Sequence, residues 1–311
     1  MHWHWLIVIY LFLGGLGAGA YLTSFAAEKG WLGKTSSLKR VGYYIAAPVV
    51  ALGTALLVFD LGQGFWKPWL LIGLLSNFSS VMTWGVYILS AFILVGLIKG
   101  FCVWKNIAVP DGLTWSGAVL ALATGTYTGL LLAAVKAVPF WSTGIMPLLF
   151  VVSALSTGLS LSSLLAPLVE REYFTVGREN QVHILLIGAE LIIVTVLMGM
   201  MISGINGPAG QASATMLITG VYSLVFWGYF IGLGLIVPLL AFIIEARRSK
   251  RVVTKEVAIP LAAREIAATV QRKHHSYLTI VTDVSVLVGG FALRALIILA
   301  ALPVWDGLTI P

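Results

Sequence analysis

Long apolar runs alternate along the chain with short segments that hold nearly all of its charged residues. A helix needs about 20 apolar residues to cross the hydrocarbon core of a bilayer, and eight runs reach that length. They span residues 5–27, 39–59, 70–98, 114–136, 145–168, 181–203, 214–244 and 278–302. Strands of a membrane barrel would be shorter and would alternate between apolar and polar residues. The pattern therefore predicts an all-α membrane protein, with eight transmembrane helices in a bundle and one domain, residues 1–311.

The distribution of basic residues predicts the orientation of these helices. Eight spans place both termini on one side of the membrane and the odd-numbered loops on the other. The odd-numbered loops, with Lys99 at the edge of one, hold 16 of the 19 basic residues, whereas the even-numbered loops hold only Lys67 and Lys136. Because loops rich in Lys and Arg remain in the cytoplasm, we predict a multi-pass protein of the cytoplasmic (inner) membrane with its N and C termini outside.

A strongly basic segment, residues 246–276, separates the last two predicted spans and is predicted to be a cytoplasmic loop. Its simplest interpretation is a solvated loop that is attracted to the anionic headgroups of membrane lipid. A short helix on the membrane surface and a docking site for a partner protein are the alternatives.

The composition agrees with a membrane protein and excludes several other classes. Of the 311 residues, 59% are apolar and 10% are charged, whereas a soluble domain has about 25% charged residues. The mean hydropathy of +0.99 excludes a soluble globule and a disordered protein. The net charge of +7 does not indicate binding to nucleic acid, because the basic residues flank apolar runs and so act as topology signals.

Residues that bind metals are too few for a redox centre within this protein. The single cysteine, Cys102, excludes an iron–sulfur cluster and a metal–thiolate site. A membrane haem needs two axial ligands at matching depth on facing helices, and of the five histidines only His183 lies near a span. P-loop, nucleophile-elbow and HExxH motifs are also missing. We therefore predict no haem, no iron–sulfur cluster, no metal site and no catalytic residue set.

Three ionisable residues lie inside the predicted spans: Glu190, Asp283 and Arg294. Ionisable residues are costly in a bilayer and are functional candidates by default. Glu190 lies near mid-depth and Asp283 lies in the cytoplasmic half. We therefore predict a proton path through Glu190 and Asp283, with Asp60 at the outer end of the second span. The alternative is structural pairing, for example of Arg294 with Glu190.

Several polar residues share the outer half of the predicted bundle. At a rise of 1.5 Å per residue, Arg294 and Tyr127 each lie roughly 13 Å from the outer ends of their spans, and Tyr10 lies roughly 9 Å in. Asp60 and Gln63 lie on the same side. A polar cluster in the outer half, with carboxylates leading inward, suits a ligand that exchanges protons. Tyrosines that only satisfy structural hydrogen bonds are the alternative.

Glycines of the first and fourth spans predict close packing between helices. Gly15 and Gly19, like Gly125 and Gly129, have the four-residue spacing that lets two helices approach closely. A dinucleotide-binding loop would need a strand–turn–helix context, which a continuous apolar run does not offer. Packing beside a flat ligand is the alternative.

Short motifs occur in nearly every predicted span. In sequence order they are YLFLGGLGAG (10–19), FDLG (59–62), FWK (65–67), SSVMTWG (79–85), YTGLL (127–131), PF (139–140), PLLF (147–150), GAE (188–190), GLGLIVP (232–238) and LVG (287–289), followed by Arg294. Together, in this order and with eight spans, they resemble the NrfD/polysulfide reductase C family of integral membrane subunits. Any single motif is weak, but the set covers nearly the whole sequence.

The resemblance implies a function and its partners. Subunits of this family bind menaquinone or another quinone near the outer face, and exchange electrons with a ferredoxin-like, four-cluster iron–sulfur subunit. That subunit connects to a catalytic subunit, which is a molybdopterin enzyme or a multihaem cytochrome. The protein would then be the quinone-binding membrane anchor of a respiratory oxidoreductase.

The resemblance also implies a set of quinone-binding residues. The tyrosine of the Tyr-Thr-Gly motif, here Tyr127, is a quinone ligand in the polysulfide reductase branch. That branch has a histidine in the first span where this protein has Tyr10, which leaves the second hydrogen bond to Tyr10, His4 or Asp60. Two further residues of the polar cluster in the outer half, Gln63 and Arg294, complete the predicted quinone-binding set.

Two other functions fit parts of the pattern. A secondary transporter would also use glycine-rich spans and buried carboxylates, although the sequence has neither a clear inverted repeat nor a pair of interrupted helices. A purely structural anchor would leave Tyr127, Glu190 and Arg294 without a task.

Overall fold

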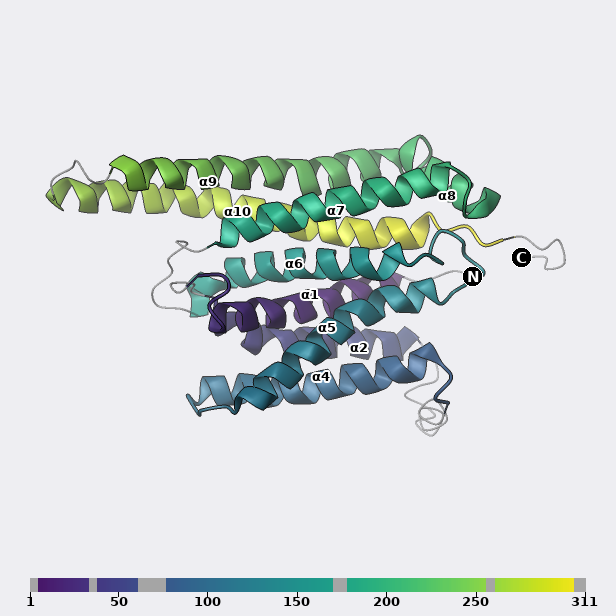
Figure 1. The fold of residues 1–311 in the computed structure, drawn as a ribbon, viewed down its shortest axis with the longest axis horizontal. Coiled ribbons are helices and arrows are strands. Elements are labelled where there is room, and N and C mark those ends of the chain that lie inside the picture. Colours follow the sequence, from purple (N-terminus) through teal and green to yellow (C-terminus); the bar gives the residue numbers. More distant parts are fainter. Residues whose placement is uncertain (1–4, 34–37, 61–76, 170–177, 256–260, 305–311) are drawn as a thin grey trace.

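The computed structural model describes residues 5–33, 38–60, 77–169, 178–255 and 261–304, with side chains apart from those of residues 59–60 and 248–276. Its helices, labelled in Figure 1, are α1 (Trp5–Glu28), α2 (Val41–Asp60), α4 (Val81–Trp104), α5 (Asp111–Ala133), α6 (Ile145–Val169), α7 (Glu179–Ile202), α8 (Gly207–Ile218), the π-helix η1 (Val225–Ile236), α9 (Val237–Lys255) and α10 (Leu261–Leu299).

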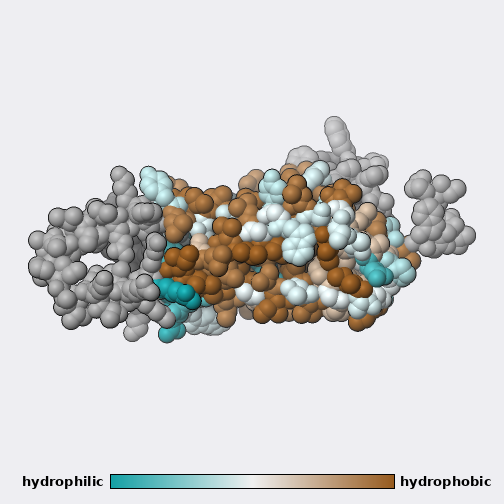
Figure 2. All heavy atoms as spheres, turned by 90° about the horizontal axis from the view of Figure 1, so that it is seen from above, coloured by the Kyte–Doolittle hydropathy of each residue, from teal (hydrophilic) through white to brown (hydrophobic). Residues whose placement is uncertain are grey.

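The predicted all-α fold with eight membrane spans is confirmed. Eight helical segments of the described residues are long and apolar enough to cross a bilayer, and η1 and the start of α9 together form the seventh, Val225–Arg247. Large apolar side chains such as Leu94, Leu185 and Ile192 are more than half exposed. Figure 2 shows apolar residues covering the middle of the molecule on the face in view. Such a surface suits lipid rather than water.

The third span lies further along the sequence than the apolar run predicts. Its helix, α4, begins at Val81 after Ser80, whose side-chain hydroxyl accepts a hydrogen bond from the Met82 amide and so caps the helix. It continues to Trp104, so Lys99, which the sequence places at the edge of a loop, lies inside the helix and is buried. Part of the predicted span, residues 70–76, falls outside the described residues.

The predicted seventh span, 214–244, combines two separate elements. The short helix α8 ends at Ile218, the backbone turns, and η1 starts at Val225. Gly220 lies in this turn so close to the Met216 backbone that a Cβ atom would be 2.7 Å from the Met216 Cα. The apolar run is continuous in sequence, but this tight turn divides it.

The helices form two four-helix groups that meet at α1 and α6. The first group contains α1, α2, α4 and α5, and the second contains α6, α7, η1 with α9, and α10. The two groups are joined where α6 packs on both α1 and α5, and at the α1–α6 contact Gly19 lies directly against the backbone of Ala154 and Gly158. The close helix packing predicted for Gly19 is confirmed, and only glycine fits at this contact.

The two ends of the bundle differ. In Figure 1, the start of α1 and the end of α10 lie at one end, here called the terminal end. At the opposite end, here called the hairpin end, α9 and α10 run side by side and project beyond the other helices. The sequence predicts a loop over residues 246–276, but α9 continues to Lys255 and α10 begins at Leu261. The structure therefore shows helices on both sides of residues 256–260.

Candidate functional site

Tyr10 and Tyr127, which the sequence predicts at similar depth, lie close together inside the first helix group. Tyr10 is on α1 and Tyr127 is on α5, and the two hydroxyl groups interact electrostatically. The Tyr10 side chain is fully buried, and its hydroxyl has no hydrogen-bond partner among the described residues. An unsatisfied buried hydroxyl costs about 1–3 kcal/mol, so a ligand oxygen at this position would stabilise the protein.

A glycine of α4 makes room for the Tyr127 ring. The hydroxyl end of that ring lies directly against Gly85, so any side chain at position 85 would collide with it. Gly85 ends the SSVMTWG motif and Tyr127 begins the YTGLL motif. These two motifs are therefore in contact, and the hydroxyl end of Tyr127 lies between α1, α4 and α5.

Three of the predicted site residues lie outside what the structure describes. His4 and Gln63 are not among the described residues, and Asp60 ends α2 without a described side chain. Their predicted roles stay predictions.

Arg294 lies between the two helix groups and is fully buried. Its Nε donates a hydrogen bond to the Leu11 carbonyl of α1 at 3.2 Å. Its Nη1 donates to the Ser153 hydroxyl of α6 at 3.0 Å and to the Gly290 carbonyl at 2.7 Å. The contacts of Arg294 thus face α6 and α10, whereas Tyr10, the neighbour of Leu11, faces Tyr127. The peptide unit between Tyr10 and Leu11 of α1 therefore lies between Arg294 and the Tyr10 side chain.

Glu190 lies on α7 and shares a hydroxyl group with Arg294. Its buried carboxyl interacts with the Ser153 side chain and with the Arg294 charge. The described residues contain no direct ion pair between Glu190 and Arg294, so Ser153 bridges them. The sequence suggested a direct pair of Arg294 with Glu190, and the structure instead links the two through the Ser153 hydroxyl.

Asp283 forms a second buried polar cluster, nearer the hairpin end. Its carboxylate lies 3.8 Å from Nε2 of His183, which stacks on Phe242 with 4.1 Å between ring centres. It also interacts with the side chains of Ser160 and Ser163. Neither Asp283 oxygen nor Nδ1 of His183 has a hydrogen-bond partner among the described residues.

His183 is a residue that sequence reasoning missed, because it was considered only as a haem ligand. A signal was available: His183 and Glu190 are seven residues apart, so they lie on the same face of a helix.

A third polar cluster joins the hairpin ends of the first helix group and was also missed. Lys99 of α4 forms an ion pair with Glu28 of α1 at 3.2 Å and donates a hydrogen bond to the Thr114 hydroxyl of α5 at 2.8 Å. Tyr43 of α2 donates a hydrogen bond to the same Glu28 carboxylate. The hydropathy pattern gave no signal for this cluster, because Lys99 and Glu28 both lie at the ends of apolar runs.

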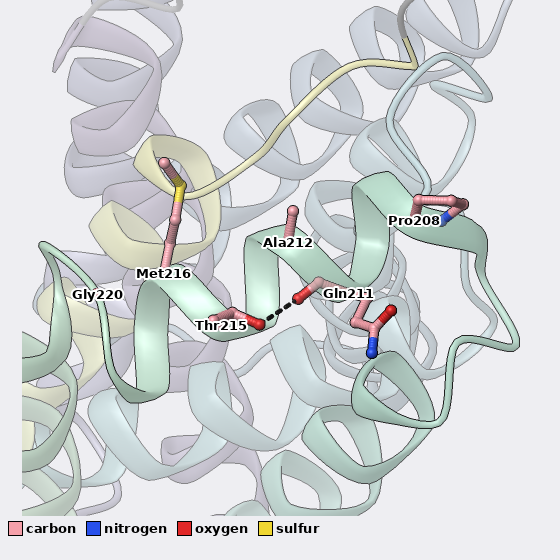
Figure 3. A pocket seen from close by; sticks show the side chains of 6 residues that line it. All are labelled: Pro208, Gln211, Ala212, Thr215, Met216 and Gly220. Atoms are coloured by element: carbon pink, nitrogen blue, oxygen red, sulfur yellow. Dashed lines mark hydrogen bonds between the residues drawn. The ribbon is translucent and has the colours of Figure 1, made fainter.

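The surface groove shown in Figure 3 lies elsewhere, along α8. Its lining residues are Pro208, Gln211, Ala212, Thr215, Met216 and Gly220. The Thr215 hydroxyl donates a hydrogen bond to the Gln211 carbonyl within the helix. The groove is open, is lined by no charged residue, and contains none of the predicted site residues.

Fold and buried polar groups together define a multi-pass helical membrane protein with ionisable side chains buried inside its two helix groups. The protein belongs to the family described as "Polysulphide reductase, NrfD", whose profile matches residues 1–264. The resemblance inferred from the motifs is thereby confirmed.

Named relatives agree with this membership. The C subunit of the polysulfide reductase of Wolinella succinogenes is 32% identical, and the alignment covers 96% of this protein and 93% of the relative. Protein NrfD of Escherichia coli is also 32% identical, over 76% of this protein and 83% of the relative. The NrfD homolog of Haemophilus influenzae is 26% identical, over 77% and 82%.

Proposed function

We propose that this protein is the quinone-binding membrane subunit of a respiratory oxidoreductase. The observation that carries the proposal is the fully buried Tyr10 hydroxyl, which lacks a partner among the described residues although Tyr127 lies beside it. A quinone needs hydrogen-bond donors for its carbonyl oxygens and an apolar slot for the rest of the molecule. The region between α1, α4 and α5 supplies two such donors, the hydroxyl groups of Tyr10 and Tyr127, and menaquinone is the expected ligand.

The proposed roles of the residues follow from their positions. Tyr127 and Tyr10 donate hydrogen bonds to the quinone, and Gly85 leaves the space that the Tyr127 ring occupies against α4. Asp60, His4 and Gln63 stay candidates for the second carbonyl oxygen and for proton exchange. Arg294 acts from behind α1, through the Leu11 carbonyl, rather than as a direct ligand. When bound, the quinone supplies the two-electron chemistry, which this protein's own side chains do not provide.

Electron exchange calls for partner subunits. The sequence has one cysteine, which cannot hold a cluster, so the electrons pass to or from another protein. The relative from Wolinella succinogenes is named as one component of a polysulfide reductase. By analogy we propose a four-cluster iron–sulfur subunit and a catalytic subunit, either a molybdopterin enzyme or a multihaem cytochrome.

The proposed orientation rests on the charge asymmetry of the loops. It places the terminal end outside the cytoplasmic membrane and the hairpin end, with its basic residues, in the cytoplasm. The quinone site then lies in the outer half, so the iron–sulfur subunit would dock on the outer face.

A binding experiment tests the proposal without knowledge of the terminal substrate. The purified wild-type protein, titrated with a fluorescent menaquinol analogue in detergent, is expected to bind it saturably. Tyr10→Phe removes only the hydroxyl and should weaken binding by about fivefold or more. Tyr21→Phe is the matched control, because Tyr21 is also fully buried in α1 but bonds to the Thr114 carbonyl instead. Equal binding by wild type and Tyr10→Phe would contradict this site.

A further inference from the structure

Three aromatic side chains form a cluster at the hairpin end of the first helix group. Phe25 lies on α1, Trp31 lies in the turn that follows α1, and Trp115 lies about one turn into α5. Phe25 meets both tryptophan rings edge to face, with centroid distances of 5.6 Å to Trp31 and 4.8 Å to Trp115. In Figure 1, α1 ends and α5 begins at the hairpin end. Because both helices are membrane spans, the cluster lies at the level of the lipid headgroups.

The turn that carries Trp31 has a well-defined backbone. The Trp31 amide donates to the Ala26 carbonyl at 2.8 Å, and the Gly30 amide donates to the Ala27 carbonyl at 3.1 Å. Gly30 has a φ of +78°, which favours glycine. These two bonds form a Schellman motif, in which the residue after the glycine packs on the last turns of the helix. Trp31 is thereby held against Phe25, although more than half of its ring surface is exposed.

An ion pair lies beside the tryptophan rings. The Lys29 Nζ donates a hydrogen bond to Oδ1 of Asp111 at 2.8 Å and lies 5.9 Å from the centre of the Trp115 ring. Asp111 begins α5, and its side chain is 80% exposed. An ammonium group has three donors and a carboxylate has two acceptor oxygens, of which the pair uses one each. A cation and an anion therefore lie side by side at the membrane surface, each with capacity for a further partner.

An interfacial aromatic belt does not by itself explain this arrangement. Tryptophans commonly lie at membrane interfaces, and Trp104 is such a residue at the same end of the bundle, with Lys105 lying 4.6 Å from its ring centre. Lys105, however, has no carboxylate partner among the residues that the structure describes. An exposed ion pair contributes little to stability, so stability alone does not account for the acid beside Lys29.

The charges around the pair favour a ligand without net charge. Lys99 pairs with Glu28 at 3.2 Å and also interacts electrostatically with Asp111. Together with Lys29, the group has two cations and two anions. An anionic lipid would bring a further negative charge next to the exposed Asp111 carboxylate, whereas a zwitterionic headgroup would bring one charge of each sign. The alternating charges of Lys29 and Asp111 match the phosphate and the ammonium group of such a headgroup.

The acceptor determines the kind of ammonium group. The Lys29 ammonium already lies over the Trp115 ring, so the Asp111 carboxylate is the acceptor open to the cation of a ligand. A primary ammonium group donates hydrogen bonds to a carboxylate. A quaternary ammonium group has no N–H donor and is recognised by aromatic faces instead. The site therefore suits ethanolamine rather than choline.

We infer that Lys29 and Asp111, with Trp31 and Trp115 beside them, bind the headgroup of a phosphatidylethanolamine lipid. Asp111 accepts hydrogen bonds from the primary ammonium group, and Lys29 donates to the phosphate. The tryptophan rings, which have an apolar body and a polar edge, pack against the glycerol backbone. Under the proposed orientation, the lipid belongs to the cytoplasmic leaflet. Lipid binding here is independent of the proposed quinone site, with which it shares no residue.

Native mass spectrometry of the purified protein tests the site. Phosphatidylethanolamine, phosphatidylcholine and phosphatidylglycerol with identical acyl chains are each titrated into the wild-type protein. One phosphatidylethanolamine molecule should bind about fivefold or more tightly than either of the other lipids. Equal binding of phosphatidylcholine would show that the ammonium group is not recognised. Tighter binding of phosphatidylglycerol would show that the basic residues attract anionic lipid instead, and either result would overturn the inference.

Two variants separate the headgroup contacts, and a third is the control. Asp111→Asn should lose the preference for phosphatidylethanolamine over phosphatidylcholine and should gain affinity for phosphatidylglycerol, because it removes the negative charge. Lys29→Gln should weaken the binding of phosphatidylethanolamine and phosphatidylcholine alike, because both carry the phosphate. Lys105→Gln is the matched control, because Lys105 also lies over a tryptophan ring at the hairpin end but without an acid. It should bind all three lipids as the wild type does.

Cross-linking in a bilayer gives a second readout. Vesicles of phosphatidylcholine with a trace of a photoreactive phosphatidylethanolamine, labelled near the start of one acyl chain, should yield adducts on the peptides of Trp31 and Trp115. Excess phosphatidylethanolamine should suppress these adducts, and excess phosphatidylcholine should not. Adducts that are equally frequent on the Trp104 peptide, or an unchanged lipid preference in both Asp111→Asn and Lys29→Gln, would contradict the site. Where one of these two variants fails to fold, the other decides.

Discussion

The Lys99 ammonium lies 3.2 Å from the Glu28 carboxylate and 4.7 Å from the centre of the Tyr43 ring, and the Lys99 side chain is almost fully buried. The Glu28 side chain is one-third exposed (34%), so this ion pair stands at the edge of the buried interior. Through it, and through the Thr114 hydroxyl, the hairpin ends of α1, α4 and α5 are held together.

The two partners of this ion pair should respond differently to substitution. Glu28→Gln leaves the Lys99 charge buried without its counter-ion. Such a loss costs up to about 3–5 kcal/mol of stability in fully buried pairs. The cost is smaller here, because Glu28 is one-third exposed and solvent screens part of the interaction. Lys99→Met leaves Glu28 near water and should be milder. Thermal unfolding of the purified protein in detergent would show Glu28→Gln as less stable than Lys99→Met, with the double variant recovering part of the loss. Equal stability of the two single variants would contradict this account.

Tyr127→Phe should impair the quinone site while leaving the fold intact. The substitution keeps the ring against Gly85 and removes only the hydroxyl, so a buried carbonyl oxygen of the ligand loses its donor at about 1–3 kcal/mol. Quinone-linked turnover should fall by roughly tenfold, since about 1.4 kcal/mol corresponds to that factor. Dye-linked activity of the catalytic partner is the control. Normal quinone-linked turnover at all quinone concentrations would show that Tyr127 is not a ligand.

Gly85→Ala should disturb the same site by a different route. A methyl group at position 85 would occupy the space of the Tyr127 hydroxyl end, so the ring must move. Quinone affinity should fall in a titration, with helix content by circular dichroism preserved. Gly188→Ala is the matched control, because no atom beyond its own stretch of helix lies within 4 Å of the position that its added Cβ would take. Identical quinone affinities in both variants would contradict the contact.

Glu190→Gln should slow turnover without weakening quinone binding. Among the described residues, Glu190 is linked to the site through Ser153 and Arg294, so loss of its titratable proton should affect proton exchange rather than the ligand contacts. We expect a lower maximal rate, by about tenfold or more, with an unchanged half-saturating quinone concentration. A raised half-saturating concentration at an unchanged maximal rate would instead indicate that Glu190 binds the quinone.

The orientation has its own direct measurement. A reporter that is active only after export, fused behind Pro311, should be active in cells, and the same reporter inserted after Gly30, in the first loop, should be inactive. The basis is the excess of Lys and Arg in the odd-numbered loops. The reverse pattern would place the hairpin end outside.

The number of spans and the helical fold were predictable from hydropathy, because a bilayer permits few alternatives to a long apolar helix. The start of the seventh span was not, because the turn at Gly220 interrupts an apolar run without any charge or proline to mark it. Residues 246–276 were predicted to form a loop because their charges exclude them from lipid. Charge, however, does not prevent a helix from continuing beyond the membrane, as α9 and α10 do.

The sequence indicates how deep the candidate site residues lie along their helices, but not which neighbouring helix each side chain faces. A rise of 1.5 Å per residue assigns Tyr10, Tyr127 and Arg294 to the outer half of the bundle. The side of the helix that each residue faces depends on how the helices pack, and hydropathy within an all-apolar span does not report it. The electrostatic interaction of Tyr10 with Tyr127 follows from packing of α1 on α5, whereas packing of α1 on α6 brings the same part of α1 to Arg294.

The contact of Gly19 with Ala154 and Gly158 has a consequence for biosynthesis. The ribosome delivers α1 to the membrane first, but the partner for its glycine face, α6, is the fifth span to be made. Until α6 has been inserted, that face of α1 is covered by lipid or by the insertion machinery. A protein truncated after α5 would therefore hold Tyr10 and Tyr127 without the helix against which α1 is aligned, and we expect it to be degraded rather than to accumulate as an independent four-helix protein.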